Sequence, residues 1–385
     1  MDWRKEKEQY ITKSKRVVVK VGSAVLASGE GLDLSRVENL AAELAKLHDT
    51  GREVILVSSG AVAAGRGVMQ AKRAITTTAL PDKQAAAAIG QSRLMYAYDQ
   101  AFAARGKVSA QVLLTRDDLK SRQRFLNARN TFATLLEWGA IPVVNENDTV
   151  VVNELKFGDN DTLGGLLLNL TGADIFINLT SARGVFDADP GTNPDAKIMA
   201  CIEDVQNLDV NALCGAKTAL GSGGMHSKLR AASRAAQLGV PTYIVPGRED
   251  GILTRVFTEP GADFGTWVRP SGKVIRSRKF WLAYNAEPTG AVTIDAGAVK
   301  ALEKGGKSLL PAGITGVTGQ FGHGALVSIH GPDGTVVGVG LCNYSAAELR
   351  RVMGKSLVDC AGLIKNGAAY AEAVHRDNML LHAAM

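Results

Sequence analysis

The sequence predicts an α/β protein, with a mainly parallel sheet sandwiched by helices and followed by a small β-rich module. Short apolar runs alternate with stretches of helical spacing along most of the chain, which is typical of such a sheet. With 46% hydrophobic residues and 42 glycines among 385, the chain can form a large core. Towards the C-terminus the pattern changes to short strands and tight turns, which indicates a compact, barrel-like β module.

Composition and charge exclude several classes of protein. The first 14 residues are charged and are expected to be a solvated lead-in, and no apolar run is long enough to span a membrane. We therefore expect a cytoplasmic protein. The four cysteines are widely spaced and show no metal-binding pattern, so they predict neither a metal site nor disulfides. The net charge of +6 suits an anionic ligand without identifying one.

The first predicted strand, Arg16 to Val21, carries a lysine among valines. A buried ammonium without a partner is costly, so Lys20 is expected to reach an anion or the end of the strand. Ser35 and Glu38 are spaced as a capping box and predict the start of the next helix.

The second strand, Glu53 to Val57, runs into the small-residue turn Ser58 to Gly65. A strand followed by such a turn and a helix presents backbone N–H groups and the positive end of a helix dipole. A carboxylate and a phosphate fit this arrangement equally well.

Two polar clusters surround one apolar segment further along the chain. The run Ile141 to Val144 ends in Asn145 to Asp148, and Gly158 to Asp161 follows a dozen residues later. Either cluster alone would predict only a turn, because Asn, Asp and Gly are turn formers. Two of them around a buried strand favour a site for a small polar substrate, at the carboxyl edge of the sheet.

A glycine-rich loop precedes a later helix. The strand Ile175 to Leu179 ends at Thr180 and Ser181, and the loop Gly221 to Lys228 places a lysine at a helix start. This loop is the strongest candidate phosphate cradle in the chain, although it does not fit the Walker A pattern.

The candidate residues suit phosphoryl transfer. Lys20 and Lys228 are expected at the same sheet edge, where they could neutralise a phosphoryl group in transit. An acid is needed between two like charges, and Asp161 is the candidate. The scattered histidines fit no hydrolase pattern. A carboxylate acceptor would need no general base, because it is already ionised at pH 7.

Motifs along nearly the whole chain resemble the glutamate 5-kinases of the amino-acid kinase superfamily. They are VVVKVGSAVL, SSGAVAAG, QSRLMYAYDQ, LLTRDDL, RFLNARNT, PVVNEND, FGDND, SGGMHSK, SLLPAGITGVTGQF and AVHRDNM. The resemblance implies an amino-acid kinase domain over residues 1–270, a linker over 271–289, and a PUA pseudobarrel with a C-terminal tail over 290–385.

The resemblance also implies an activity, partners and roles for particular residues. The activity is transfer of a phosphoryl group from ATP, with Mg²⁺, to the γ-carboxylate of L-glutamate, the first step of proline biosynthesis. Homo-oligomers, dimers or tetramers, are the family expectation, and the labile product suggests hand-off to γ-glutamyl phosphate reductase. Lys20, Lys228 and Asp161 would be catalytic, and glutamate would be bound by Ser59, Asp148 and Asn160. No protein-only metal site is expected. ATP would be held by Lys20, Thr180, Ser181, Ser222, Gly223, Gly224, Met225, His226, Ser227 and Lys228.

Two departures and two alternatives accompany this resemblance. The family usually has Thr-Asp where this chain has Thr180-Ser181, so a carboxylate near the nucleotide is missing. Ser222 and Ser227 replace threonines of the family loop but keep the hydroxyls. A second hypothesis is another kinase of the superfamily, acting on a different carboxylate, a carbamate or a nucleotide. A third is an RNA-binding or RNA-modifying protein, suggested only by the PUA-like module and a basic linker.

Overall fold

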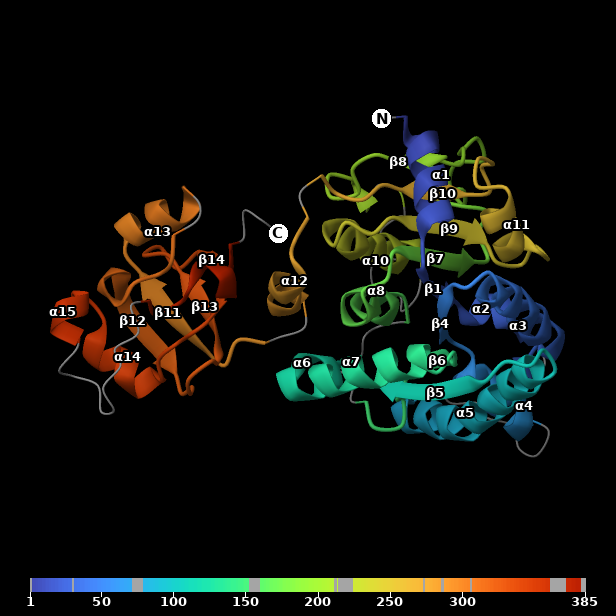
Figure 1. Cartoon of the computed structure of the whole chain (residues 1–385), viewed down its shortest axis with the longest axis horizontal. Coiled ribbons are helices and arrows are strands. Elements are labelled where there is room, and N and C mark those ends of the chain that lie inside the picture. Colours follow the sequence, from blue (N-terminus) through green and yellow to red (C-terminus); the bar gives the residue numbers. More distant parts are fainter. Residues whose placement is uncertain are drawn as a thin grey trace. The chain divides into compact units, whose positions relative to one another are not determined.

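The computed structural model consists of two compact units, Met1–Val274 and Ile275–Met385 (Figure 1). It describes residues 2–29, 31–70, 79–151, 160–210, 213, 224–272, 274–284, 287–304, 307–360 and 372–381. None of the described helices combines the length and the apolar character needed to cross a membrane.

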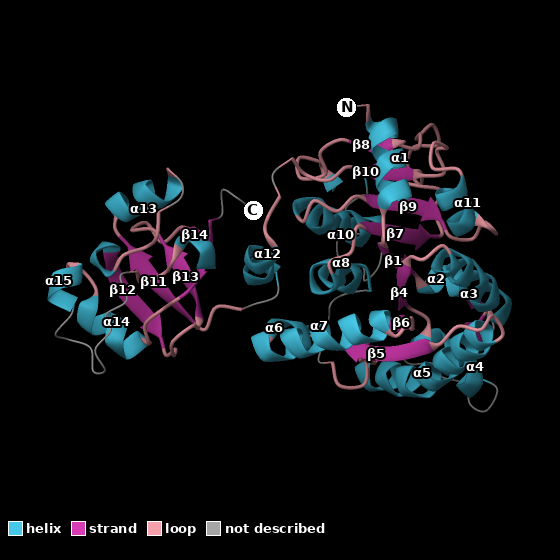
Figure 2. Ribbon diagram, in the orientation of Figure 1, coloured by secondary structure: helices cyan, strands magenta, loops and turns pink. Residues whose placement is uncertain are grey.

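The first unit is built on an eight-stranded sheet in the order β5-β6-β4-β1-β7-β9-β10-β8 (Figure 2). Every neighbouring pair is parallel except β9 and β10, which are antiparallel. The predicted mainly parallel sheet is therefore confirmed. The strands are β1 Arg16–Val21, β4 Glu53–Ser58, β5 Ser109–Leu114, β6 Ile141–Glu146, β7 Ile175–Thr180, β8 Cys201–Ile202, β9 Thr242–Pro246 and β10 Thr266–Val268.

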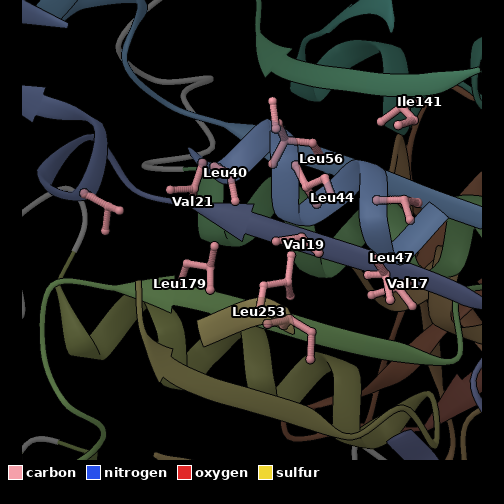
Figure 3. Packing of buried hydrophobic residues seen from close by; sticks show 14 of the residues in the cluster. Val17, Val19, Val21, Leu40, Leu44, Leu47, Leu56, Ile141, Leu179 and Leu253 are labelled. Atoms are coloured by element: carbon pink, nitrogen blue, oxygen red, sulfur yellow. The ribbon is translucent and has the colours of Figure 1, made fainter. Parts of the chain in front are cut away.

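The two faces of this sheet are covered by different helices. On β1, Val17, Val19 and Val21 belong to the core that also contains the apolar side of α3 (Leu34–Asp49) and α11 (Ile252–Thr258), as Figure 3 shows. Because side chains alternate along a strand, Lys20 lies on the opposite face. There it is covered by α8 (Asn160–Thr171), whose Gly164 lies against Phe176 and the Cβ atom of Lys20.

Helix α8 also packs against α7 (Arg122–Glu137) and α10 (Met225–Gln237). A side chain at Gly164 would place its Cβ atom only 2.8 Å from the Phe176 ring, so glycine permits the close approach of α8 to the sheet. The remaining elements of the unit are α1 Trp3–Lys13, α2 Ser23–Leu26, β2 Ala27–Ser28, β3 Gly31–Leu32, α4 Ala61–Gln70, α5 Leu80–Ala103 and α6 Arg116–Lys120.

The predicted solvated lead-in is wrong, because residues 3–13 form helix α1 and its inner side is buried. Lys7 is 0% exposed and donates hydrogen bonds to Ala262 O at 2.7 Å and to Asp263 Oδ1 at 2.6 Å. These partners lie more than 250 residues away in the chain, so they compensate the buried charge in a way that no local pattern reveals.

The predicted capping box at Ser35 and Glu38 is also wrong. Helix α3 starts two residues earlier, and Asp33 is its N-cap, accepting a hydrogen bond from the backbone N–H of Arg36. Ser35 Oγ donates to the Asp33 carboxylate at 2.6 Å, so the serine supports the cap instead of forming it.

The second unit contains a five-stranded sheet in the order β12-β11-β13-β14-β15, with its own apolar core. Helix α12 lies within the predicted linker and contacts β14 and β15. At the start of α14 the expected capping box of Ser345 and Glu348 is present. The elements are α12 Ser277–Tyr284, β11 Gly290–Ile294, α13 Ala296–Glu303, η3 Pro311–Gly313, β12 Ile314–Gly319, β13 Leu326–His330, β14 Val336–Leu341, α14 Ala346–Val352, α15 Leu357–Cys360, η4 Arg376–Asn378 and β15 Met379–Leu381.

Candidate active site

A cavity of about 540 Å³ opens where four central strands, β1, β4, β6 and β7, end at their carboxyl edge. This is the edge at which open α/β sheets bind ligands. The starts of α2, α4, α5, α8 and α10 contribute the rest of the wall. The lining residues are Lys20, Gly22, Ser23, Ala24, Val25, Ser59, Gly60, Ala61, Val62, Ala63, Lys83, Asn145, Glu146, Asp148, Asn160, Leu179, Thr180, Ser181, Ala182, Gly224, Met225 and Lys228.

The carboxylate of Asp161 holds two lysines at this cavity. Asp161 is fully buried in the first turn of α8, with Lys20 Nζ 2.5 Å from its Oδ1 atom and Lys228 Nζ 3.0 Å from its Oδ2 atom. Both ammonium groups are themselves almost buried, with 4% and 10% of their side chains exposed. One carboxylate thus keeps two like charges together at the cavity wall.

Two further side chains donate to the same carboxylate. Asn178 Nδ2 donates to Oδ1 of Asp161 at 2.9 Å, and Ser227 Oγ lies 2.7 Å from Oδ2. Asn178 pairs with Lys20 in the register of β7 and β1, so both residues face α8. The partners of Asp161 therefore come from two strands and from the first turn of α10.

The electrostatics of Asp161 follow from this arrangement. Burial by itself raises the pKa of a carboxyl group, but the charges of Lys20 and Lys228 outweigh it, and hydrogen bonds from Lys20 and Ser227 add to their effect. Together they lower the pKa of Asp161 from 3.8 to about 2. Asp161 is consequently a permanent anion at physiological pH, which suits a positioning group and excludes a proton donor.

A carboxamide network organises the other end of the cavity. Asn160 Nδ2 donates to Ser59 Oγ at 2.8 Å, to Asn145 Oδ1 at 2.9 Å and to Ser58 O at 3.2 Å. Asn145 Nδ2 in turn donates to Gln91 Oε1 of α5 at 2.8 Å. The network joins the ends of β4 and β6 to the start of α8 and to the middle of α5. Asn160 Oδ1 is buried and has no hydrogen-bond partner among the described residues.

The structure brings most of the sequence-predicted site residues to one cavity. Lys20, Ser59, Asp148, Asn160, Thr180, Ser181, Gly224, Met225 and Lys228 line it, and Asp161 lies directly behind the two lysines. Ser227 contacts Asp161, whereas His226 is not among the lining residues. Ser222 and Gly223 lie outside the described residues.

Sequence reasoning missed Asn178 and Lys83. Asn178 is a polar residue inside the apolar strand β7, and that interruption was the available signal, as it was for Lys20. Lys83 lies in the first turn of α5 and lines the cavity, but no local pattern distinguishes it from a surface lysine.

The fold and the two lysines at its carboxyl edge indicate a kinase, and comparison with known families agrees. The model of the amino acid kinase family matches residues 15–246, and that of the PUA domain matches residues 290–363. The chain belongs to the amino acid kinase family.

Two curated relatives narrow the assignment within this family. A protein named glutamate 5-kinase from Oleidesulfovibrio alaskensis is 59% identical over 383 residues, and one from Nitratidesulfovibrio vulgaris is 57% identical over 383 residues. In both comparisons the alignment covers 100% of each chain. Within the family, the chain therefore groups with the glutamate 5-kinases. Among solved structures, a UMP kinase from Bacillus anthracis covers 67% of this chain and 96% of its own, with 19% identity and a TM-score of 0.46, too low to inform the assignment.

Proposed function

We propose that this protein transfers the γ-phosphoryl group of ATP to the γ-carboxylate of L-glutamate and forms L-glutamyl 5-phosphate, the first step of proline biosynthesis. The observation that carries the proposal is the pair Lys20 and Lys228, held by one buried carboxylate at the cavity wall. Phosphoryl transfer requires chiefly positioning and the neutralisation of charge, and this arrangement supplies both.

In the proposed reaction, an oxygen of the γ-carboxylate forms a bond to the γ-phosphorus of ATP. The bond from that phosphorus to the oxygen bridging the β- and γ-phosphates breaks, and its electron pair leaves with ADP. The acceptor is ionised at pH 7, so no proton has to be removed. The two ammonium groups stabilise the negative charge on the equatorial oxygens of the phosphoryl group, and Asp161 keeps them in position.

Glutamate is assigned to the end of the cavity lined by Ser59, Asp148 and Asn160. The Asp148 carboxylate and the Asn160 carboxamide oxygen can accept hydrogen bonds from the substrate's α-ammonium group. Asn160 Oδ1 suits this role, because it is buried and has no partner among the residues that the structure describes, and such an oxygen is costly until a ligand donates to it.

ATP is assigned to the opposite end, beside Thr180, Ser181, Gly224 and Met225. The first turn of α10 presents N–H groups and the positive end of the helix dipole towards phosphate oxygens. Ser222, Gly223, His226, Ser227 and the two catalytic lysines complete the proposed nucleotide site. As a kinase of this family, the protein uses ATP.

The proposed role of Mg²⁺ follows from the side chains available near the cavity. Within the described part of the chain, no group of three or more His, Cys, Asp or Glu side chains could hold a metal ion. Asp161 is engaged by two lysines, and Ser181 stands where the resemblance implies an acid. We therefore propose that Mg²⁺ is held mainly by phosphate oxygens, as is common for this ion.

Trapping of the product tests this function. An acyl phosphate reacts with hydroxylamine, so ATP, Mg²⁺ and L-glutamate should give γ-glutamyl hydroxamate. Aspartate, N-acetylglutamate and a sample without acceptor serve as controls. Hydroxamate from another acid, but not from glutamate, would assign the protein to a different substrate within the same family.

Further proposals concern partners and location. Because an acyl phosphate hydrolyses readily, we propose hand-off to γ-glutamyl phosphate reductase, and adding that reductase should raise the product yield in a coupled assay. A cytoplasmic location remains a prediction. Assembly into a homo-oligomer, a dimer or a tetramer, is also a prediction, and light scattering tests it. RNA binding by the PUA domain remains a prediction that a salt-dependent filter-binding assay tests.

A further inference from the structure

A third lysine at the cavity has no role in the mechanism so far. We propose that Lys83 binds the α-carboxylate of the acceptor and thereby makes the enzyme selective for an amino dicarboxylate. This inference rests on the proposed function and extends it, because it names the side chain that binds the α-carboxylate, which lies at the opposite end of glutamate from the reacting γ-carboxylate.

The charges around the cavity lead to this assignment. Of the described residues that line it, only Lys20, Lys83 and Lys228 are lysine or arginine. Lys20 and Lys228 are both held by Asp161, and the proposed function assigns them to the phosphoryl group. Glutamate bound here presents an α-ammonium and an α-carboxylate in addition to the reacting group. Glu146 and Asp148 match the ammonium, which leaves Lys83 as the matching charge for the carboxylate.

The position of helix α5 supports the same assignment. Lys83 is in its first turn, and the neighbouring Gln84 donates a hydrogen bond from Nε2 to Val151 O at 2.9 Å. Two turns later, Gln91 accepts from Asn145, the residue before Glu146. Helix α5 is thus fixed at two points to the segment that carries Asp148, so Lys83 belongs to the acceptor end of the cavity.

Lys83 is also available to a ligand. Its side chain is exposed, and it forms no ion pair with any of the described residues. Ala61, the first residue of α4, lines the same cavity but lies against Gly90, two turns farther along α5. Lys83 is therefore the positive charge that the first turn of α5 contributes to the cavity. A carboxylate within reach of its ammonium group would gain a charge-assisted hydrogen bond.

Two acids that each lack one group of glutamate separate this role from a general effect. Glutarate keeps both carboxylates and lacks the ammonium, whereas 4-aminobutyrate keeps the ammonium and lacks the α-carboxylate. We expect Lys83→Met to raise the KM for glutamate and the inhibition constant of glutarate by the same factor, about ten- to a hundredfold, as for a hydrogen bond between charged groups. The inhibition constant of 4-aminobutyrate and the KM for ATP should stay within about twofold.

Asp148→Asn is the complementary variant, and it should weaken 4-aminobutyrate while sparing glutarate. Lys83→Arg keeps the charge and should retain most of the affinity for glutamate. Lys46→Met is the matched control, because Lys46 is an exposed lysine of α3 outside the cavity, and its constants should equal those of the wild type.

The outcomes are distinct. If Lys83→Met leaves glutarate inhibition unchanged, or weakens both analogues and ATP equally, the assignment of Lys83 is wrong although the kinase activity stands. If the wild-type protein forms no hydroxamate from glutamate, the proposed function itself fails, and this is known before any variant is made.

Discussion

The two ends of the cavity differ in how far the protein alone completes them. At the phosphoryl end, both oxygens of Asp161 are engaged by Lys20, Lys228, Asn178 and Ser227. At the acceptor end, Asn160 Oδ1 lacks a partner among the described residues, and Lys83 is exposed. The two lysines are therefore preorganised, whereas under the proposed function the acceptor end gains its remaining hydrogen bonds when the substrate binds.

This difference has an energetic reason. The phosphoryl group is negatively charged throughout its transfer, and groups that are already oriented towards it need no reorganisation in the transition state. A binding site for a polar substrate, in contrast, must keep hydrogen-bonding groups available until the ligand arrives. Substitutions at the phosphoryl end should consequently affect kcat and stability, and those at the acceptor end should affect KM.

The largest effect is expected for Asp161→Asn. The substitution keeps the shape of the side chain but leaves two nearly buried ammonium groups facing each other without an anion. We expect kcat to fall on the order of a thousandfold or more, and the free energy of unfolding to fall by about 3 kcal/mol. Steady-state kinetics and urea unfolding measure the two quantities. Unchanged stability would show that the lysines are less buried than this structure places them.

Lys228→Ala should come next, with a loss in kcat of about a hundred- to a thousandfold. Asp161 keeps Lys20 as its partner, so the fold should remain intact and the KM for glutamate should change little. Kinetics beside a thermal melt distinguish this from misfolding. A kcat close to that of the wild type would remove Lys228 from the catalytic role.

Much of the phosphoryl end could be predicted from the sequence, and the reason is local. Lys20 interrupts a run of valines, and Lys228 follows a glycine-rich loop, so each deviates from the pattern around it. Asn178 interrupts its strand in the same way, but its importance appears only through its register with Lys20 across two strands. The sequence of either strand alone does not predict how two distant strands pair.

The errors have two origins. Helix α1 is rich in charge, and its buried Lys7 is compensated by Ala262 and Asp263, which follow more than 250 residues later in the sequence. The mistaken cap at Ser35 shows a different limit, because Asp33 and Ser35 are both good caps and the backbone selects between them. At the acceptor end, Lys83 resembles any exposed lysine until the cavity is seen.

Asp148→Ala tests the acceptor end directly. Loss of the carboxylate should raise the KM for glutamate by about ten- to a hundredfold, because a hydrogen bond to a charged group is lost. The KM for ATP and the melting temperature should remain close to those of the wild type. A rise in the KM for ATP instead would move Asp148 to the nucleotide end and reverse the comparison.

The pH dependence of stability should distinguish the ends as well. The pKa of Asp161 is lowered from 3.8 to about 2, so its stabilising effect is fully present above pH 4 and is lost as the pH falls through 2. Relative to Asp161→Asn, the wild type should lose about 2 kcal/mol over this interval. Unfolding by urea at several pH values measures the difference. A constant difference between pH 5 and pH 2 would contradict the lowered pKa.

The smallest effect is expected for Ser227→Ala. The serine hydroxyl lies 2.7 Å from Asp161 Oδ2 and 2.9 Å from Gly224 O, so it can donate to either acceptor. Without it, Asp161 still holds both lysines, and one hydrogen bond contributes about 1 kcal/mol, which corresponds to a fall in kcat of about fivefold. Ser227→Thr keeps the hydroxyl and should restore the rate. A loss as large as that of Lys228→Ala, not rescued by threonine, would mean that the first turn of α10 is held in place by Ser227 and that the phosphoryl end is less rigid than its contacts indicate.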